Sequence, residues 1–291
     1  MGTAETKGSD LAKKLGCEWQ SDDPLILPEV WDVASARLLV EAGFPVLTTS
    51  AAAYAWAQGY RPGERVGLEE LLVVAGRIIR DCQIPIIADL EGCFDRSNQY
   101  IKRGVMAALT IGGKGAIIGD GGRDGMHQML GVMEVANRIK SARMAAMEVK
   151  KDLTLIARTD ALHLGAIVAS PLEETVNRAN AYYNAGADII HIPGVQNLDI
   201  IQQLKAHIEG PIMITVSHGN APLLSDYREA DVTAICLGTG LMRSALSDMR
   251  TKAEALMATG QFLHLDDTMT DNDLSDVLCR PVGYENKRAS S

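Results

Sequence analysis

The chain has 291 residues, of which 47% are hydrophobic and 22% are charged, and it carries a formal net charge of −9. This composition predicts a globular protein with one large core, and the acidic balance without a Lys/Arg-rich block argues against nucleic acid or an anionic membrane as a partner. Residues 1–10 lack an apolar leader and no apolar stretch reaches the length of a membrane span, so we expect a cytoplasmic protein without a membrane segment.

Residues 1–23 are polar and form a predicted N-terminal extension with a helix around residues 10–15. Beyond it, short apolar runs alternate with segments of helical periodicity. The apolar runs predict strands at about residues 24–28, 45–50, 84–89, 115–119, 153–158, 188–193, 211–216 and 232–237. The periodic segments predict helices at about residues 31–43, 66–82, 97–111, 130–150, 172–185, 197–209, 222–230 and 240–259.

The predicted strands are too apolar to alternate, which is typical of parallel strands covered on both faces. Eight strand-then-helix units predict an α/β fold, a closed (β/α)₈ TIM-type barrel over residues 24–259. A doubly wound open sheet is the alternative. Residues 260–291 carry few apolar side chains after Phe262 and Leu263, and we expect this C-terminal tail to dock on a neighbouring subunit or to fray.

The third predicted strand ends at two carboxylates, Asp89 and Glu91. In barrels of this kind, ligands bind where the strands end. If the strand stays extended to Glu91, both side chains point the same way and can share a cation or a proton. A pair of solvated loop carboxylates is the alternative.

Three other strand ends carry candidate binding residues. The second strand leads into small residues that include Ser50, Ala51 and Ala52, whose backbone amides can cradle an oxyanion, although an ordinary turn would have the same composition. Arg158 ends the fifth strand, where its guanidinium can bind a carboxylate in bidentate fashion or form a structural salt bridge. His218 and Asn220 follow the seventh strand and are placed to contact a substrate.

The fourth predicted strand leads into a glycine-rich segment with charges of both signs, which indicates a mobile lid or a plain connection. Its candidate catalytic groups are Asp120, Arg123 and His127, and the lid groups that can supply a charge or a proton are Arg123, Asp124 and His127. His191, within the sixth strand, is predicted to be a packed and hydrogen-bonded histidine rather than a catalytic one.

Six motifs follow one another in the order of the predicted barrel. They are Pro-Glu-Val-Trp-Asp-Val-Ala-Ser-Ala-Arg-Leu at residues 28–38, Ala-Gly-Phe at 42–44, Thr-Ser-Ala at 49–51, Ala-Asp-Leu-Glu at 88–91, Ile-Ala-Arg-Thr-Asp-Ala at 156–161 and Ala-Gly-Ala-Asp at 185–188. Together they resemble the isocitrate lyase and phosphoenolpyruvate mutase superfamily over about residues 24–258. The resemblance implies a (β/α)₈ barrel, usually a tetramer in which the last helix packs on a neighbouring subunit. We therefore expect a homo-oligomer, a dimer or a tetramer.

The resemblance also implies a chemistry. Members bind Mg²⁺ and a small 2-oxo or 2-hydroxy acid, and they break or make C–C or C–P bonds through an enolate of pyruvate type. By the resemblance, Asp89 is a direct metal ligand and Glu91 a water-mediated one. Amides near Ser50 to Ala52 would hold an oxyanion, and Arg158 would hold the substrate carboxylate.

The chain departs from the family pattern at several acidic or polar positions. Pro62 and Gly119 replace two carboxylates of the metal shell, and Pro193 replaces a polar contact after the sixth strand. Asp120 can replace the missing glutamate only in part. The lid is shorter than in the lyases and lacks their cysteine, so cleavage of isocitrate or methylisocitrate is not expected.

Three functions are compatible with these residues. The first is a Mg²⁺-dependent C–C lyase or decarboxylase acting on a small 2-oxo or 2-hydroxy (di)carboxylic acid through an enolate, supported by Asp89, Glu91 and Arg158. The second is C–P chemistry like that of a phosphoenolpyruvate mutase or a phosphonopyruvate hydrolase, supported by Arg123. The third is a repurposed or inactive barrel with a binding role, which the changes at the metal shell favour.

Overall fold

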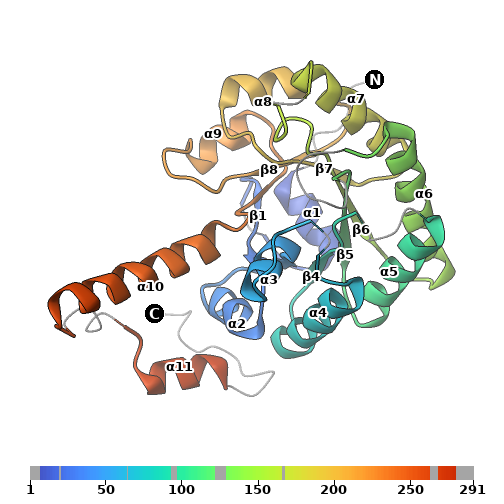
Figure 1. The fold of residues 1–291 in the computed structure, drawn as a ribbon. Helices are drawn as coiled ribbons and strands as arrows, with labels where there is room; N and C mark the ends of the chain where they lie inside the picture. Colours follow the sequence, from blue (N-terminus) through green and yellow to red (C-terminus); the bar gives the residue numbers. More distant parts are fainter. Residues whose placement is uncertain are drawn as a thin grey trace.

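The computed structural model describes residues 7–19, 21–63, 65–92, 97–121, 129–165, 168–262 and 268–279. These residues form a parallel sheet surrounded by helices (Figure 1). The strands are β1 Leu25–Leu27, β2 Glu29–Val30, β3 Leu47–Thr49, β4 Ile86–Asp89, β5 Gly115–Gly119, β6 Thr154–Arg158, β7 Ile189–Ile192, β8 Ile212–Thr215 and β9 Ala234–Cys236.

The sheet closes through a short segment that pairs with both of its edges. β1 pairs with β9 and β2 pairs with β3, and only Pro28 separates β1 from β2. Proline has no N–H group, so it interrupts the ladder without ending the extended backbone. The first predicted strand is therefore split in two, and the predicted eight-stranded (β/α)₈ barrel is confirmed.

Helices follow the strands as predicted. They are α1 Gly8–Leu15, α2 Val33–Glu41, α4 Leu68–Cys82, α5 Asn98–Thr110, α6 Val132–Glu148, α7 Pro171–Asn184, α8 Leu198–Lys205, α9 Leu224–Glu229 and α10 Gly240–Thr259. Two further helices were not predicted, α3 Ala51–Ala57 and α11 Asp271–Leu278. α11 begins with a capping box between Thr270 and Asp273, and it lies against α2 of the same chain with Val277 buried.

An apolar layer fills the barrel at the N-terminal ends of the strands. It contains inward-facing side chains from every strand position of the ring, joined by Leu11 and Leu15 of α1: Leu25, Leu27, Val46, Ile87, Ile117, Ile156, Ile189, Met213, Ala234 and Cys236. A second layer of apolar side chains lies between the strands and the outer helices. Because α1 and this inner layer fill the N-terminal end, the C-terminal end of the strands is the open one.

No helix within the described residues has both the length and the apolar character needed to cross a membrane.

Candidate active site

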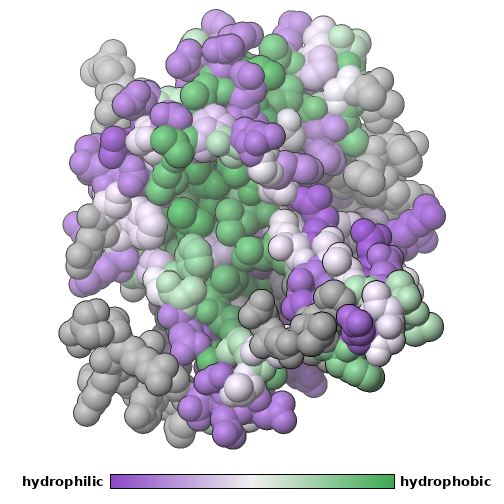
Figure 2. Space-filling model, turned by 90° about the vertical axis from the view of Figure 1, so that its left-hand side faces the viewer, coloured by the Kyte–Doolittle hydropathy of each residue, from purple (hydrophilic) through white to green (hydrophobic). Residues whose placement is uncertain are grey.

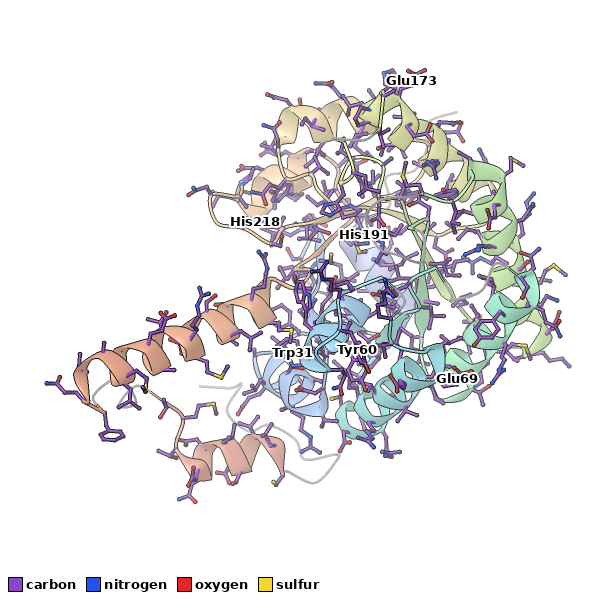
Figure 3. The ribbon with its side chains drawn as sticks, in the orientation of Figure 1. Trp31, Tyr60, Glu69, Glu173, His191 and His218 are labelled. Carbon is purple, nitrogen blue, oxygen red and sulfur yellow. The ribbon has the colours of Figure 1, made fainter. Side chains whose placement is uncertain are left out.

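A cavity of about 400 Å³ opens at the C-terminal ends of the strands, and we call it the mouth cavity. Its polar lining comes from strand ends all around the barrel: Glu29, Ser50, Asp89, Glu91, Arg158, Asp160, His163, His191, Thr215, Ser217 and His218. Figure 3 shows His191 toward the middle of the barrel and Glu173 and Glu69 on the outer helices. The structure thus brings together most of the residues that the sequence singled out.

Asp89 is held rigidly at the end of β4. Its backbone N–H donates to Thr49 Oγ1 at 2.9 Å, and its carboxylate accepts from the N–H of Ala51 at 3.2 Å and from that of Glu91 at 3.0 Å. Glu91 has a φ of 48°, in the left-handed region, so the strand does not stay extended to Glu91 as the spacing argument required. Both carboxylates are nonetheless buried and line the mouth cavity.

Arg158, at the end of β6, lies between the carboxylate of Asp89 on β4 and that of Asp160, two residues further along the chain. Its Nη1 is 3.9 Å from Asp89 Oδ1, and its Nε is 3.2 Å from Asp160 Oδ1. Burial disfavours the guanidinium charge, but the carboxylates of Asp160, Asp89 and Glu91 outweigh it and raise the pKa of Arg158. Arg158 is therefore a permanent cation beside the Asp89 carboxylate.

Gly119 leaves the space that Arg158 occupies. A Cβ atom at this position would lie 2.9 Å from Nη2 and 3.1 Å from Cζ of Arg158. The change from the family glutamate to Gly119 therefore removes a carboxylate and also lets the guanidinium fold across β5.

Asp120 faces away from the mouth cavity. It is fully buried, and Oδ2 accepts hydrogen bonds from Arg178 Nη1 at 3.1 Å and from the Tyr182 hydroxyl at 3.0 Å. Oδ1 accepts from the backbone N–H of Asp160 at 2.8 Å. The structure does not place Asp120 with the predicted catalytic residues, because its oxygens bind Arg178, Tyr182 and the backbone of Asp160, the partner of Arg158.

Hydrogen bonds within the protein limit the predicted amide cradle. The N–H of Ser50 donates to Val30 O at 2.8 Å and that of Ala51 donates to Asp89, because α3 begins here with Ser50 as its N-cap. Two of the proposed oxyanion donors are therefore already engaged. Ser50 and Ala52 still line the mouth cavity.

The remaining predicted residues divide into three groups. His218 lines the mouth cavity at its exposed rim, with Nδ1 3.1 Å from Ser217 Oγ. Asn220 lies on a separate surface hollow with Gln196 and Asp199. Arg123 and His127 are outside the described residues.

His191 is packed and hydrogen-bonded, as predicted. It is 4% exposed, and its Nε2 is 2.8 Å from Thr215 Oγ1. Burial, with a smaller effect of Arg158, lowers the pKa of His191 to about 3, so the ring is neutral at physiological pH. The buried Nδ1 has no hydrogen-bond partner among the described residues.

Glu29 is the acidic residue that the sequence argument missed. Its side chain lines the mouth cavity and has side-chain hydrogen bonds with Ser50 and Cys236. Burial raises the pKa of Glu29 to about 7, and the nearby Asp89 charge acts in the same direction, while the hydrogen bonds oppose the shift. Counting two residues on from the inward-facing Leu27 would have placed Glu29 inside the barrel mouth.

The mouth cavity can accommodate a magnesium ion at Asp89 and Glu91. Among the described residues, no three carboxylate, imidazole or thiol groups gather as a metal cluster. Mg²⁺ needs only one or two protein carboxylates, because waters and substrate oxygens supply its other ligands. Two buried carboxylates that line the mouth cavity fit that requirement.

Known proteins resemble this chain in sequence and fold. The sequence profile of the family described as phosphoenolpyruvate phosphomutase matches residues 18–257. Oxaloacetate decarboxylase 1 of Pseudomonas fluorescens (strain Pf0-1) is 31% identical over 210 residues, covering 70% of this chain and 69% of that protein. Oxaloacetate decarboxylase 2 of the same strain is 27% identical over 283 residues, covering 94% and 93%. The structure of oxaloacetate acetylhydrolase in complex with the product oxalate has the same fold, with a TM-score of 0.80, 23% identity and 94% coverage of each chain.

Proposed function

The chain belongs to the phosphoenolpyruvate phosphomutase family, and from this premise we propose that it is a magnesium-dependent carbon–carbon bond lyase or decarboxylase. Its substrate is a small 2-oxo or 2-hydroxy (di)carboxylic acid, which reacts through an enolate of pyruvate type. The observation that carries this proposal is the single arrangement of Arg158, Asp89 and Glu91 around one cavity. A cytoplasmic location and a dimeric or tetrameric assembly belong to the same proposal.

Arg158 binds and orients the substrate. Its guanidinium lines the cavity and forms an ion pair with Asp160, whose backbone N–H donates to Asp120. A planar fork of this kind pairs with a carboxylate through two parallel hydrogen bonds. The substrate carboxylate is therefore anchored next to Asp89.

Asp89 and Glu91 would hold the metal ion beside that anchor. A bound Mg²⁺ ion supplies Lewis-acid stabilisation of the negative charge that develops on the 2-oxo oxygen. A cavity of about 400 Å³ lies at the lower end of the usual range for small-molecule sites, which suits a short acid and its waters.

Carbon–phosphorus chemistry is the second candidate. A phosphonate or phosphoryl group carries more negative charge than a carboxylate and favours a second cation. Within the described lining of the mouth cavity, Arg158 is the one arginine or lysine. The described part of the lining therefore favours carbon–carbon chemistry, while Arg123, the residue that supports carbon–phosphorus chemistry, lies outside the described residues.

The third candidate, a repurposed barrel with a binding role, rests on the changes at Pro62, Gly119 and Pro193. Pro62 and Pro193 still line the mouth cavity, and Gly119 makes room for Arg158. Pro62 and Pro193 therefore leave the mouth cavity open, and Gly119 provides the space that the Arg158 guanidinium occupies.

Ligand-dependent thermal unfolding tests the proposal. We expect oxalate, an analogue of the pyruvate enolate, to raise the unfolding midpoint in the presence of Mg²⁺ and much less in its absence. A ligand at 100 times its Kd stabilises the folded state by about 2.7 kcal/mol. Pyruvate release from oxaloacetate and from 2-alkylmalates then identifies the reaction.

The variant Asp89→Asn tests the metal site. It keeps the size of the side chain but removes the charge that a metal ion needs, so the Mg²⁺-dependent shift should vanish. No shift of the wild-type midpoint with oxalate, phosphonopyruvate or any diacid would reject enzymatic chemistry of this type and favour the repurposed barrel.

A further inference from the structure

A ring of polar side chains lies next to the apolar layer, on its C-terminal side: Glu29, Asp89, Arg158, His191 and Thr215. Each of its members comes two residues after an inward-facing apolar residue, as Glu29 follows Leu27 and Arg158 follows Ile156. Side chains two apart on a strand point to the same face, so this ring also faces the barrel axis. Glu29 is thus a second carboxyl group at the level of the substrate anchor.

Strand order places Glu29 across the barrel from Arg158. Going round the closed sheet, β6 is four strands from β2 through β5, β4 and β3, and four strands from β1 through β7, β8 and β9. Asp89, on β4, lies midway between them. A substrate anchored on Arg158 with its 2-oxo oxygen toward Asp89 therefore extends its reacting carbon toward Glu29.

The hydrogen-bonding partners of Glu29 are neutral, and Asp89 is the charged group with the larger effect on it. Its side-chain partners are Ser50 and Cys236. Cys236 Sγ lies 3.1 Å from Thr215 Oγ1 and 3.4 Å from His191 Nε2, which extends the contact chain along β9, β8 and β7. Arg158 is the smallest of the named influences on Glu29. A carboxyl group in such surroundings keeps its proton at a higher pH than a solvated one.

Among the described residues that line the cavity, the other titratable groups are less suited to give a proton to carbon. Asp89, Glu91 and Asp160 act on the cationic Arg158, and His191 is neutral. Burial raises the pKa of Cys236 far above its usual value, so it stays a thiol. His163 and His218 are exposed at the rim. Glu29, with its pKa raised to about 7, is the group inside the ring that can exchange a proton near neutral pH.

We infer that Glu29 is the catalytic acid of this barrel and protonates the carbon of the enolate intermediate. This inference rests on the proposed function and deepens it. When a carbon–carbon bond of a 2-oxo diacid breaks with release of CO₂, the bonding electrons form the enolate. The Glu29 carboxyl gives its proton to that carbon as the ketone re-forms, and the resulting carboxylate regains a proton from water.

Exchange of pyruvate methyl protons tests this step without knowledge of the natural substrate. By microscopic reversibility, the Glu29 carboxylate removes a methyl proton, exchanges it with D₂O and returns deuterium to the carbon. The experiment follows loss of the methyl signal by proton NMR, with wild-type protein, MgCl₂ and pyruvate in D₂O. Oxalate-dependent thermal unfolding of the same samples reports whether the anchor and metal ligands are intact.

Glu29→Gln is the informative variant, because it keeps the shape of the side chain but cannot carry an acidic proton. We expect its exchange rate to fall by about 100-fold or more, the usual contribution of a general acid or base, with the oxalate-induced shift retained. The matched control is Glu173→Gln on the exposed surface of α7, which makes the same charge change far from the barrel mouth and should behave like wild type (Figure 3).

Each other outcome contradicts the inference in a distinguishable way. Exchange by Glu29→Gln within about threefold of wild type would overturn it and leave the proposed function standing, whereas loss of the oxalate shift in that variant would make Glu29 a binding residue. Wild-type protein that binds oxalate but exchanges no proton would also overturn it. If wild-type protein neither binds oxalate nor exchanges protons, the proposed function fails and the inference with it. If Glu29→Gln does not fold, Glu29→Asp replaces it. Its side chain is one methylene shorter, which moves the carboxyl group away from the substrate carbon. An unchanged proton-exchange rate in Glu29→Asp would reject the assignment.

Discussion

At the scale of single residues, the absence of a side chain at Gly119 determines where the substrate anchor lies. A Cβ atom there would approach Arg158 Nη2 to 2.9 Å, and the atom in its way is the end of a flexible side chain. We therefore expect Gly119→Ala to fold normally but to displace the guanidinium from Asp160 and Asp89. Because a hydrogen bond to a charged group contributes about 1.5–3 kcal/mol, oxalate should bind about tenfold more weakly or worse.

The matched control for this variant is Gly76→Ala. Gly76 lies within α4, and a Cβ atom there would meet only Ile111 at 3.7 Å, an ordinary contact. This substitution should leave oxalate affinity unchanged and stabilise the helix slightly. Equal oxalate affinities for the two variants in isothermal titration would show that Arg158 does not need the space above Gly119.

At the scale of elements, one buried carboxylate joins β5, the segment after β6, and α7. Asp120 accepts hydrogen bonds from Arg178 and Tyr182 of α7 and from the backbone of Asp160. The Arg178 side chain is only 7% exposed, so it needs a charged partner. We predict that Asp120→Asn lowers the free energy of unfolding by about 2 kcal/mol in urea denaturation, because the buried Arg178 loses one of its two carboxylate partners and keeps only Glu174.

An exposed ion pair provides the contrast. Glu69 pairs with Arg103 at 3.2 Å, but their side chains are 58% and 66% exposed, and Figure 3 shows Glu69 on the outer face of the barrel. Glu69→Gln should change the free energy of unfolding by less than about 1 kcal/mol. A similar loss in Asp120→Asn and Glu69→Gln would mean that burial does not strengthen the Asp120 contacts.

At the scale of the whole molecule, the sequence predicted the barrel better than the site. Buried parallel strands and amphipathic helices leave periodic patterns, so their number and order were readable. The backbone conformation of residues 50–52 could not be predicted, because small residues are equally compatible with a turn and with the start of α3. Glu29 was missed because it lies beyond Pro28, where the predicted strand stopped. The pairing of β2 with β3 shows that the extended backbone continues past Pro28, so that Glu29 faces the barrel mouth like Leu27 before it.

The last long helix provides the remaining prediction at this scale, because it projects from the barrel (Figure 1). α10 has 20 residues, of which only Met242 is buried. Leu246 and Met249 are 44% and 62% exposed, and with Met242 they follow a four-then-three spacing along one helix face. Figure 2 shows apolar side chains gathered on the side of the molecule from which α10 extends.

A helix of this length with so little tertiary contact is marginal in water, so we predict that a second copy of the chain covers its apolar face. Analytical ultracentrifugation at micromolar concentration should give a dimer or tetramer for wild-type protein. Leu246→Glu combined with Met249→Glu should shift the mass toward the monomer with an unchanged barrel signal in circular dichroism. Met147→Glu on α6, where Met147 is 75% exposed, is the control and should leave the assembly intact. A monomeric wild-type protein would contradict the prediction, since α10 would then have to be stable without a partner.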